Sequence, residues 1–309
     1  MLPRFSGRSA FLIHASLGLA LFVFMVTSRM RGAADMDQVS GSRFLTISEE
    51  EKTAVMQEQL AQASRISVMF SSAFFFLMSV WLMSHQTEMN FGLVQRSVLG
   101  KRLDFCMTLS LYISFFSALF NAIQLMDDDN LDLKTLQGES IVLDLGRPLE
   151  WMLTCPLMQL AVPILAGEKI PDSRRLTMPL LAFIVLLCGL LSTIATNIAM
   201  KAIMYCGGFL LFLVMLGQMN SCVSEASGGG ENLFSGASFL RGLVVIIALT
   251  WIPFPVWYAL SPEGFNVIQD AAGMKVAVAF LNVFSKGAFM MYLARIRTDH
   301  NTRQKTLVA

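Results

Sequence analysis

The sequence predicts an all-α polytopic membrane protein. Of its 309 residues, 55% are hydrophobic and 15% are charged, and the mean hydropathy of +0.60 lies well outside the range of soluble globular domains. The apolar residues fall in eight blocks, at positions 10–26, 66–83, 105–125, 141–165, 178–195, 202–219, 243–260 and 276–293. Each block has about the 20 residues that a helix needs to cross a bilayer, and none alternates like a membrane β-strand.

Charges in the connecting segments predict the orientation. With the N-terminus in the cytosol, the cytoplasmic segments hold 13 Lys and Arg residues against 6 acids, and the outer segments hold 8 against 14. Because Lys and Arg concentrate in cytoplasmic loops, we expect both termini in the cytosol. The first block follows Arg4 and Arg8 as a signal peptide would, but its long apolar core and the lack of a small-residue cleavage site favour a retained extra helix.

Cysteine and histidine usage argues against a metal centre. The five cysteines lie in or at the ends of the apolar blocks without a CxxC pair, and the chain has three histidines. Neither a disulfide framework nor a zinc site is indicated. We therefore expect no metal. The apolar blocks indicate membrane lipid as the surroundings of the protein, and we expect no nucleic-acid partner.

Lys286 lies near the middle of the last block, which contains no carboxylate. A charged amine in hydrocarbon costs free energy, so an intramembrane lysine is by default a functional residue. Two chemistries would keep it there. One is a salt bridge to a carboxylate on another helix, and the other is covalent capture of an aldehyde as a Schiff base, which desolvation of the amine favours.

The block at 141–165 supplies an opposite charge. Arg147, Glu150, Trp151 and Thr154 follow one another at steps of three or four residues, so they share one face of a helix. Glu150 needs a cationic partner within the membrane, and Lys286 is the candidate. Arg147 lies about one turn nearer the outer side and supplies a second cation. On the charges alone, a purely structural Glu–Lys pair remains an alternative.

Aromatic and proline residues distinguish the block at 243–260. Trp251, Phe254, Pro255 and Tyr258 recur at steps of three and four residues. Prolines kink a membrane helix and open space beside it. An aromatic stripe is usually core or an interface belt. Together with a buried lysine, a carboxylate and Trp151, it indicates a pocket for a flat conjugated ligand.

Five short motifs carry a resemblance to a known family. They are R-x-x-E-W-x-x-T-C-P at 147–156, S-R-R-x-T-M at 173–178, W-x-x-F-P at 251–255, S-P-E-G-F at 261–265 and S-K at 285–286. In this order they resemble the microbial (type 1) rhodopsins, most closely the channelrhodopsin-related branch. The resemblance implies a seven-helix retinal-binding bundle at 66–297. An extra transmembrane helix in 1–30 and an extracellular segment at 31–65 would precede it, and a cytoplasmic tail at 298–309 would follow.

By this resemblance the cofactor is all-trans-retinal, bound covalently to Lys286 as a protonated Schiff base with Glu150 as its counterion. The polyene would lie between Trp151 and Trp251. Light-driven isomerisation would change the distance between the iminium and Glu150 and so bias the helices. The other residues that the resemblance places at the retinal are Arg147, Thr154, Cys155, Pro156, Phe254, Pro255, Tyr258, Asn282 and Ser285.

Three positions depart from the relatives. Asn282 replaces an aspartate that many relatives carry four residues before the lysine, so Glu150 is expected to be the only anion beside the Schiff base. Ala161 replaces the carboxylate donor of proton pumps, which argues against outward proton pumping. The block at 105–125 contains no carboxylate, and Ile184 replaces an aspartate of cation channels. An acid-lined cation pathway is thus missing, whereas an anion pathway needs no acids.

These features favour a sensory photoreceptor whose signal leaves at the cytoplasmic side. The alternative is a light-gated channel, with anions favoured over cations, and a membrane scaffold without a chromophore has the least support. The extra N-terminal helix and cytoplasmic C-terminus also resemble rhodopsin guanylyl cyclases and rhodopsin phosphodiesterases. The chain itself has no room for a catalytic domain, so an output domain would be fused beyond residue 309 or associated with it. A dimer or trimer is expected.

Overall fold

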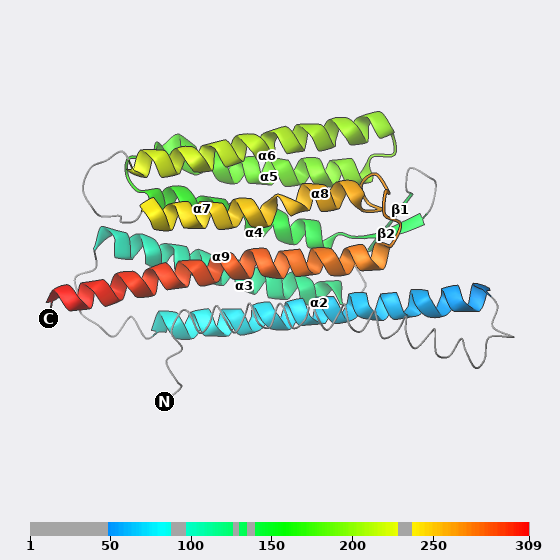
Figure 1. The fold of residues 1–309 in the computed structure, drawn as a ribbon, viewed down its shortest axis with the longest axis horizontal. Coiled ribbons are helices and arrows are strands. Elements are labelled where there is room, and N and C mark those ends of the chain that lie inside the picture. Colours follow the sequence, from blue (N-terminus) through cyan, green and yellow to red (C-terminus); the bar gives the residue numbers. More distant parts are fainter. Residues whose placement is uncertain (1–48, 88–96, 126–129, 135–139, 228–236, 309) are drawn as a thin grey trace.

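The computed structural model describes residues 49–87, 97–125, 130–134, 140–227 and 237–308. They form a bundle of long helices lying side by side, with a two-stranded hairpin at one end (Figure 1). The elements are α2 (Glu49–Thr87), α3 (Val98–Gln124), β1 (Asn130–Lys134), β2 (Ser140–Asp144), α4 (Gly146–Ala166), α5 (Asp172–Ile194), α6 (Ile198–Ser227), α7 (Ala237–Trp251), α8 (Pro253–Leu260) and α9 (Ala271–Val308). The extra helix predicted at 10–26 lies outside the described residues.

Seven segments of the described chain are long and apolar enough to cross a membrane. They overlap the last seven predicted blocks one for one, which confirms the all-helical prediction. Many of their outward side chains are large and apolar, as expected of helices that face lipid rather than water. The segments are Gln62–His85, Val98–Gln124, Gly146–Ala166, Asp172–Ile194, Ile198–Ala226, Phe239–Leu260 and Ala271–Gln304.

The span predicted at 141–165 begins too early. Residues Ser140–Asp144 form β2, which pairs antiparallel with β1 so that Ile141 lies opposite Leu133 and Leu143 opposite Leu131. α4 begins only at Gly146. Ile141, Val142 and Leu143 lengthen the apolar run, but β-branched residues at this spacing also suit a strand.

Prolines interrupt the span that holds the aromatic stripe. α7 ends at Trp251 and α8 begins at Pro253. The Ile252 N–H still donates to the Ala248 carbonyl at 3.0 Å, but Pro253 and Pro255 have no N–H to continue the ladder. The predicted kink is therefore present, and it lies beside Trp251.

The first and last of the described helices extend beyond the bundle. α2 has 39 residues and α9 has 38. α2 thus joins the acidic residues from Glu49 onward to the first described span in one continuous helix. α9 contains no proline and remains helical to Val308, so most of the polar segment predicted as a tail at 298–309 belongs to the same helix as Lys286.

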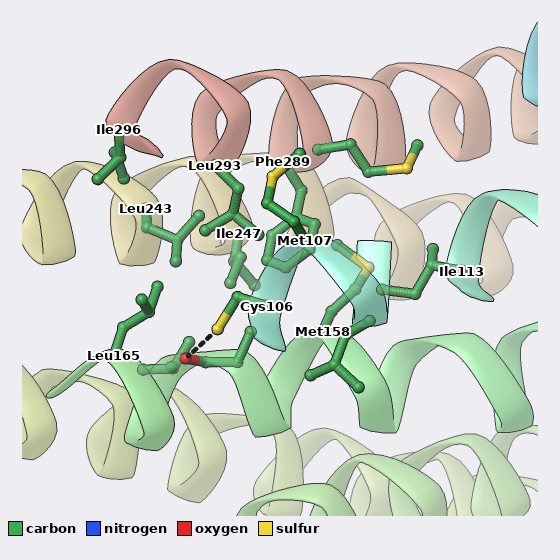
Figure 2. Close-up of a cluster of buried hydrophobic side chains, with 14 of the residues drawn as sticks. Cys106, Met107, Ile113, Met158, Leu165, Leu243, Ile247, Phe289, Leu293 and Ile296 are labelled. Atoms are coloured by element: carbon green, nitrogen blue, oxygen red, sulfur yellow. Dashed lines mark hydrogen bonds between the residues drawn. The ribbon is translucent and has the colours of Figure 1, made fainter. Parts of the chain in front are cut away.

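A buried apolar cluster fixes α9 against three other helices. Figure 2 shows side chains of α3, α4, α7 and α9 that meet between these helices. The thiol of Cys106 on α3 donates to the Ala161 carbonyl on α4 at 3.8 Å. Phe289 of α9 is fully buried in this cluster. Because Phe289 lies one turn from Lys286, the packing also fixes where the lysine points. The labelled side chains are Cys106, Met107, Ile113, Met158, Leu165, Leu243, Ile247, Phe289, Leu293 and Ile296.

A partly buried ion pair joins α3 and α9 at the end of the bundle opposite the hairpin. Asp104 lies within α3 and accepts from Arg297 of α9, at 2.7 Å from Nη2 and 2.9 Å from Nε. Arg297 is 4% exposed. Nearby, the N-cap residue of α3, Ser97, hydrogen-bonds His300 of α9 at 3.1 Å. Two polar contacts thus hold the extension of α9 to the start of α3.

Candidate functional site

Lys286 of α9 and Glu150 of α4 form an ion pair inside the bundle. Their side chains are 2% and 0% exposed. The Lys286 amine also donates to the Ser117 hydroxyl of α3 at 3.0 Å and lies 5.7 Å from the centre of the Phe75 ring of α2. Burying two charges costs free energy unless they are paired and hydrogen-bonded. Here both conditions hold, so the pair expected from the sequence is present.

Two amides hold the carboxylate of Glu150. Asn282 Nδ2 donates to both carboxylate oxygens, at 3.0 and 3.3 Å. Asn121 Nδ2 donates to Oε2 at 3.2 Å. The indole N–H of Trp151 donates to Asn282 Oδ1 at 3.1 Å, which requires the amide nitrogen of Asn282 to face Glu150. Among the described residues, Glu150 is the only carboxylate in contact with Lys286.

Each helix places its polar groups one turn apart. Asn282 and Lys286 are four residues apart on α9, as are Ser117 and Asn121 on α3, so each pair stacks on one helix face. On α4 the hydroxyl of Thr154 donates back to the Glu150 carbonyl at 2.7 Å. Three helices therefore contribute to one polar cluster at the level of the ion pair.

The contribution of α3 was not part of the sequence prediction. Ser110, Ser114, Ser117 and Asn121 are all buried and follow one another at steps of four, three and four residues. That spacing in an otherwise apolar block marks an inward-facing polar stripe. It is the signal by which Ser117 and Asn121 could have been found.

Arg147 does not join the ion pair. Its Nη2 donates to Gln124 Oε1 of α3 at 3.0 Å, although the sequence suggested it as a second cation for Glu150. The Arg147 side chain is 8% exposed. Among the described residues, its Nη1 and the Nε2 of Gln124 are buried donors without a hydrogen-bond partner. Within that part of the chain, Arg147 is a buried cation held by an amide.

A cavity begins at Lys286 and runs between aromatic side chains. Trp151 meets Phe254 edge-on, with ring centres 5.1 Å apart, and Trp257 at 6.4 Å. Ser285 also lines the cavity, and its hydroxyl lies 3.1 Å from that of Thr250 on α7. Most of the predicted residues line it, namely Arg147, Trp151, Cys155, Trp251, Phe254, Pro255, Tyr258, Asn282, Ser285 and Lys286.

Three predicted residues lie outside the cavity lining. Glu150 is on the far side of the Lys286 amine, Thr154 is fully buried against its own helix, and Pro156 lies within α4. α5 and α6 supply further lining residues. The sequence did not indicate them, because both helices are almost uniformly apolar and no pattern distinguishes the residues that face the cavity. They include Gly189, Thr193, Tyr205, Gly208 and Phe209.

The sequence matches the family described as bacteriorhodopsin-like protein over residues 56–300. The chain belongs to this family of microbial rhodopsins and is an integral membrane protein. It is 27% identical to halorhodopsin of Halobacterium salinarum (strain R1) over 165 residues, which cover 52% of this chain and 57% of that one. Halorhodopsin of Haloterrigena sp. (strain arg-4) is 29% identical, with 52% of each chain covered. The chain spans a little over half the length of these curated relatives.

Solved structures show the same fold. A structure titled halorhodopsin, a light-driven chloride pump, has a TM-score of 0.65 and 20% identity, covering 79% of this chain and 97% of that one. Thermophilic rhodopsin from Rubrobacter xylanophilus has a TM-score of 0.65 and 18% identity, covering 76% and 96%. These likenesses confirm the seven-helix rhodopsin fold.

Retinal, bound covalently as a Schiff base, is the cofactor of this family and of this chain. The residues present fit that group. A Schiff base needs a primary amine, and the Lys286 amine lines the cavity. A long conjugated chain needs flat apolar walls, which Trp151, Trp251 and Phe254 supply.

Proposed function

We propose that this chain is a light receptor in which Lys286 binds retinal and Glu150 is the counterion of the protonated Schiff base. The contact between these two buried groups, at one end of the aromatic cavity, carries the proposal. When bound, retinal supplies a change of shape on absorbing light. The remaining cavity residues that were predicted from the sequence would position it.

The residues around Glu150 stabilise its carboxylate as an anion. An anion beside the Lys286 nitrogen favours the protonated, visible-absorbing form of the Schiff base. The amides of Asn121 and Asn282 stabilise the carboxylate as an anion because they donate to it. Moving the nitrogen away from Glu150 replaces a close pair by two separated buried charges, which raises the free energy of the resting helix arrangement.

We infer that the signal leaves through α9. This helix carries Lys286 and continues to Val308 without a proline. The excess of Lys and Arg in the connectors at its far end supports a cytosolic C-terminus. The proposed organisation is the rhodopsin domain at 66–297 with the extra helix in 1–30 before it. An output domain or partner at the C-terminus, and assembly into a dimer or trimer, belong to the same proposal.

Anion transport is the second candidate. It is supported by the buried Arg147, whose Nη1, like the neighbouring Gln124 Nε2, has no partner in the described part of the chain, a donor set that suits a small anion. The halorhodopsin relatives, one titled a light-driven chloride pump, favour the same function. α3 carries its one carboxylate, Asp104, in a pair with Arg297, so its polar stripe leaves no acid to attract cations.

Light-dependent current separates the two candidates. Cells expressing the full chain with retinal are voltage-clamped under illumination in chloride and in a large impermeant anion. A sensor is expected to give no light-dependent current. A chloride-dependent current that disappears in Lys286→Ala and falls in Arg147→Gln would instead establish anion transport and contradict the sensor.

Asn282 provides a graded test of the counterion cluster. Asn282→Leu removes the amide nitrogen that donates to both oxygens of Glu150, so the carboxylate becomes a stronger competitor for the Schiff-base proton. We expect the ratio of ultraviolet to visible absorption at neutral pH to rise about tenfold, the effect of losing a hydrogen bond to a charged group. Asn121→Leu removes a single 3.2 Å bond and is expected to have a smaller effect. Spectra of the two variants identical to the parent's would contradict the assignment.

A further inference from the structure

Three hydroxyl groups line the cavity at its far end from Lys286. α5 and α6 lie on the side of the bundle away from α9 (Figure 1), so their lining residues are far from Lys286 along the cavity. Here the hydroxyls of Thr193 on α5, Tyr205 on α6 and Tyr258 on α8 line the cavity, and the Glu263 carbonyl lies 3.5 Å from the Tyr258 hydroxyl. A ligand held at Lys286 would place its ring end among them.

All three hydroxyls already give their protons to the protein. Tyr205 donates to the Pro255 carbonyl at 3.2 Å. Thr193 donates to the Gly189 carbonyl at 3.0 Å, with Tyr258 Oη at 3.4 Å as a weaker second acceptor. Tyr258 donates to the Ser192 hydroxyl at 2.9 Å.

The direction of the hydrogen bond between Tyr258 and Ser192 follows from a second bond that Ser192 makes. Ser192 is fully buried and its hydroxyl donates to the Lys201 carbonyl at 2.9 Å. It therefore has no proton left for Tyr258 and must accept from it. The Tyr205 ring is fixed as well, because it stacks on Tyr258 with centres 5.8 Å apart and meets Phe265 edge-on at 5.4 Å.

These commitments leave the three hydroxyls able to accept a hydrogen bond but without a free proton to donate. A hydroxyl oxygen that donates its proton still has lone pairs to offer. The complementary ligand group is therefore a donor, and a ligand carbonyl would face other oxygens without a proton between them.

Gly189 leaves room for a substituent. It lines the cavity, and a Cβ added there would meet nothing within 4 Å. Larger side chains would fill that space. The cavity thus combines free volume with acceptor oxygens in one place.

We propose that the pocket selects a retinal whose ring carries a hydroxyl group over unsubstituted retinal and over retinal with a ring ketone. This inference rests on the proposed retinal site at Lys286. The hydroxyl would donate to an oxygen of Thr193, Tyr205 or Tyr258 while its carbon skeleton occupies the space beside Gly189.

Competitive reconstitution tests the selection. The full chain, purified without chromophore, is incubated with an equimolar excess of all-trans-retinal, 4-hydroxyretinal, 3-hydroxyretinal and 4-oxoretinal until the bound ratio is constant. The bound retinoids are then extracted and quantified. One net hydrogen bond predicts an enrichment of the better hydroxyretinal of about fivefold over retinal, with 4-oxoretinal bound no better than retinal. Equal uptake of all four, or preference for 4-oxoretinal, overturns the proposal.

Matched variants assign the effect to the far end. Thr193→Val and Tyr205→Phe are each expected to lower the enrichment, and the double variant to bring it to about one. Thr177→Val on α5 and Tyr112→Phe on α3 change exposed residues of the same types and should leave it unchanged. Pigment formed with unsubstituted retinal shows that each variant folds. Failure of every retinoid to form a pigment would contradict the Lys286 site instead. If a variant does not fold, the retinoid preference of the parent chain alone decides whether the proposal holds.

Discussion

Replacing Lys286 with alanine is expected to abolish the visible pigment that the parent chain forms with all-trans-retinal. A methyl side chain has no amine to form the Schiff base, and the loss should be complete rather than partial. Absorption spectra after reconstitution measure it. Lys275 also lines the cavity, but it precedes Lys286 by 11 residues, about three turns of α9.

The controls separate loss of the amine from loss of the fold. Lys275→Ala should keep the pigment. Lys286→Ala alone leaves Glu150 as an unpaired buried charge, which costs about 3–5 kcal/mol. The double variant Lys286→Ala/Glu150→Gln removes that charge and should recover thermal stability while staying colourless. Visible colour in either variant lacking Lys286, or its loss in Lys275→Ala, would contradict the assignment.

Neutralising Glu150 is expected to have the second-largest effect. In Glu150→Gln the protonated Schiff base loses the anion that stabilises its charge, so the proton is released at lower pH. The pH at which half of the visible band has moved to the ultraviolet should fall by about 1–3 units. The visible form persists only below that midpoint, so more of the pigment is colourless at neutral pH. A spectrophotometric titration between about pH 5 and pH 9 measures the shift.

Two further carboxylate variants serve as controls for this result. Glu150→Asp retains the charge and should retain most of the visible band at neutral pH. Glu168→Gln neutralises an exposed acid that pairs with Arg102 at 3.0 Å after the end of α4, and it should not move the midpoint. A visible spectrum of Glu150→Gln that matches the parent throughout the titration would exclude Glu150 as the counterion.

The charged centre of the site could be predicted because charged side chains buried in a membrane have few possible partners. An amine and a carboxylate within apolar spans must be paired, so Lys286 and Glu150 could be matched across 136 residues without a structure. The aromatic wall and the proline kink followed from residue types at helical spacing. The roles of these residues in binding retinal remain predictions from family resemblance.

Other features could not be predicted from the sequence, because they depend on how separate helices are placed relative to one another. The partner of Arg147 was missed because Gln124 and Glu150 are on different helices, and only their placement shows which one the guanidinium reaches. The predicted span includes most of β2 because Ile141 and its neighbours are apolar residues that suit a strand as well as a membrane helix. Thr193 and Tyr205 became site residues only when α5 and α6 were placed around the cavity.

The unbroken course of α9 has a mechanical consequence. From Lys286 to Val308 the helix rises about 33 Å, so a tilt of about 5° at the lysine would displace its end by about 3 Å. No proline lies between the two points, so the helix has no proline kink at which to absorb that rotation. The Asp104–Arg297 pair lies between the two points, 11 residues from the lysine. How much of that displacement reaches Val308 therefore depends on whether the Asp104–Arg297 pair holds while α9 tilts.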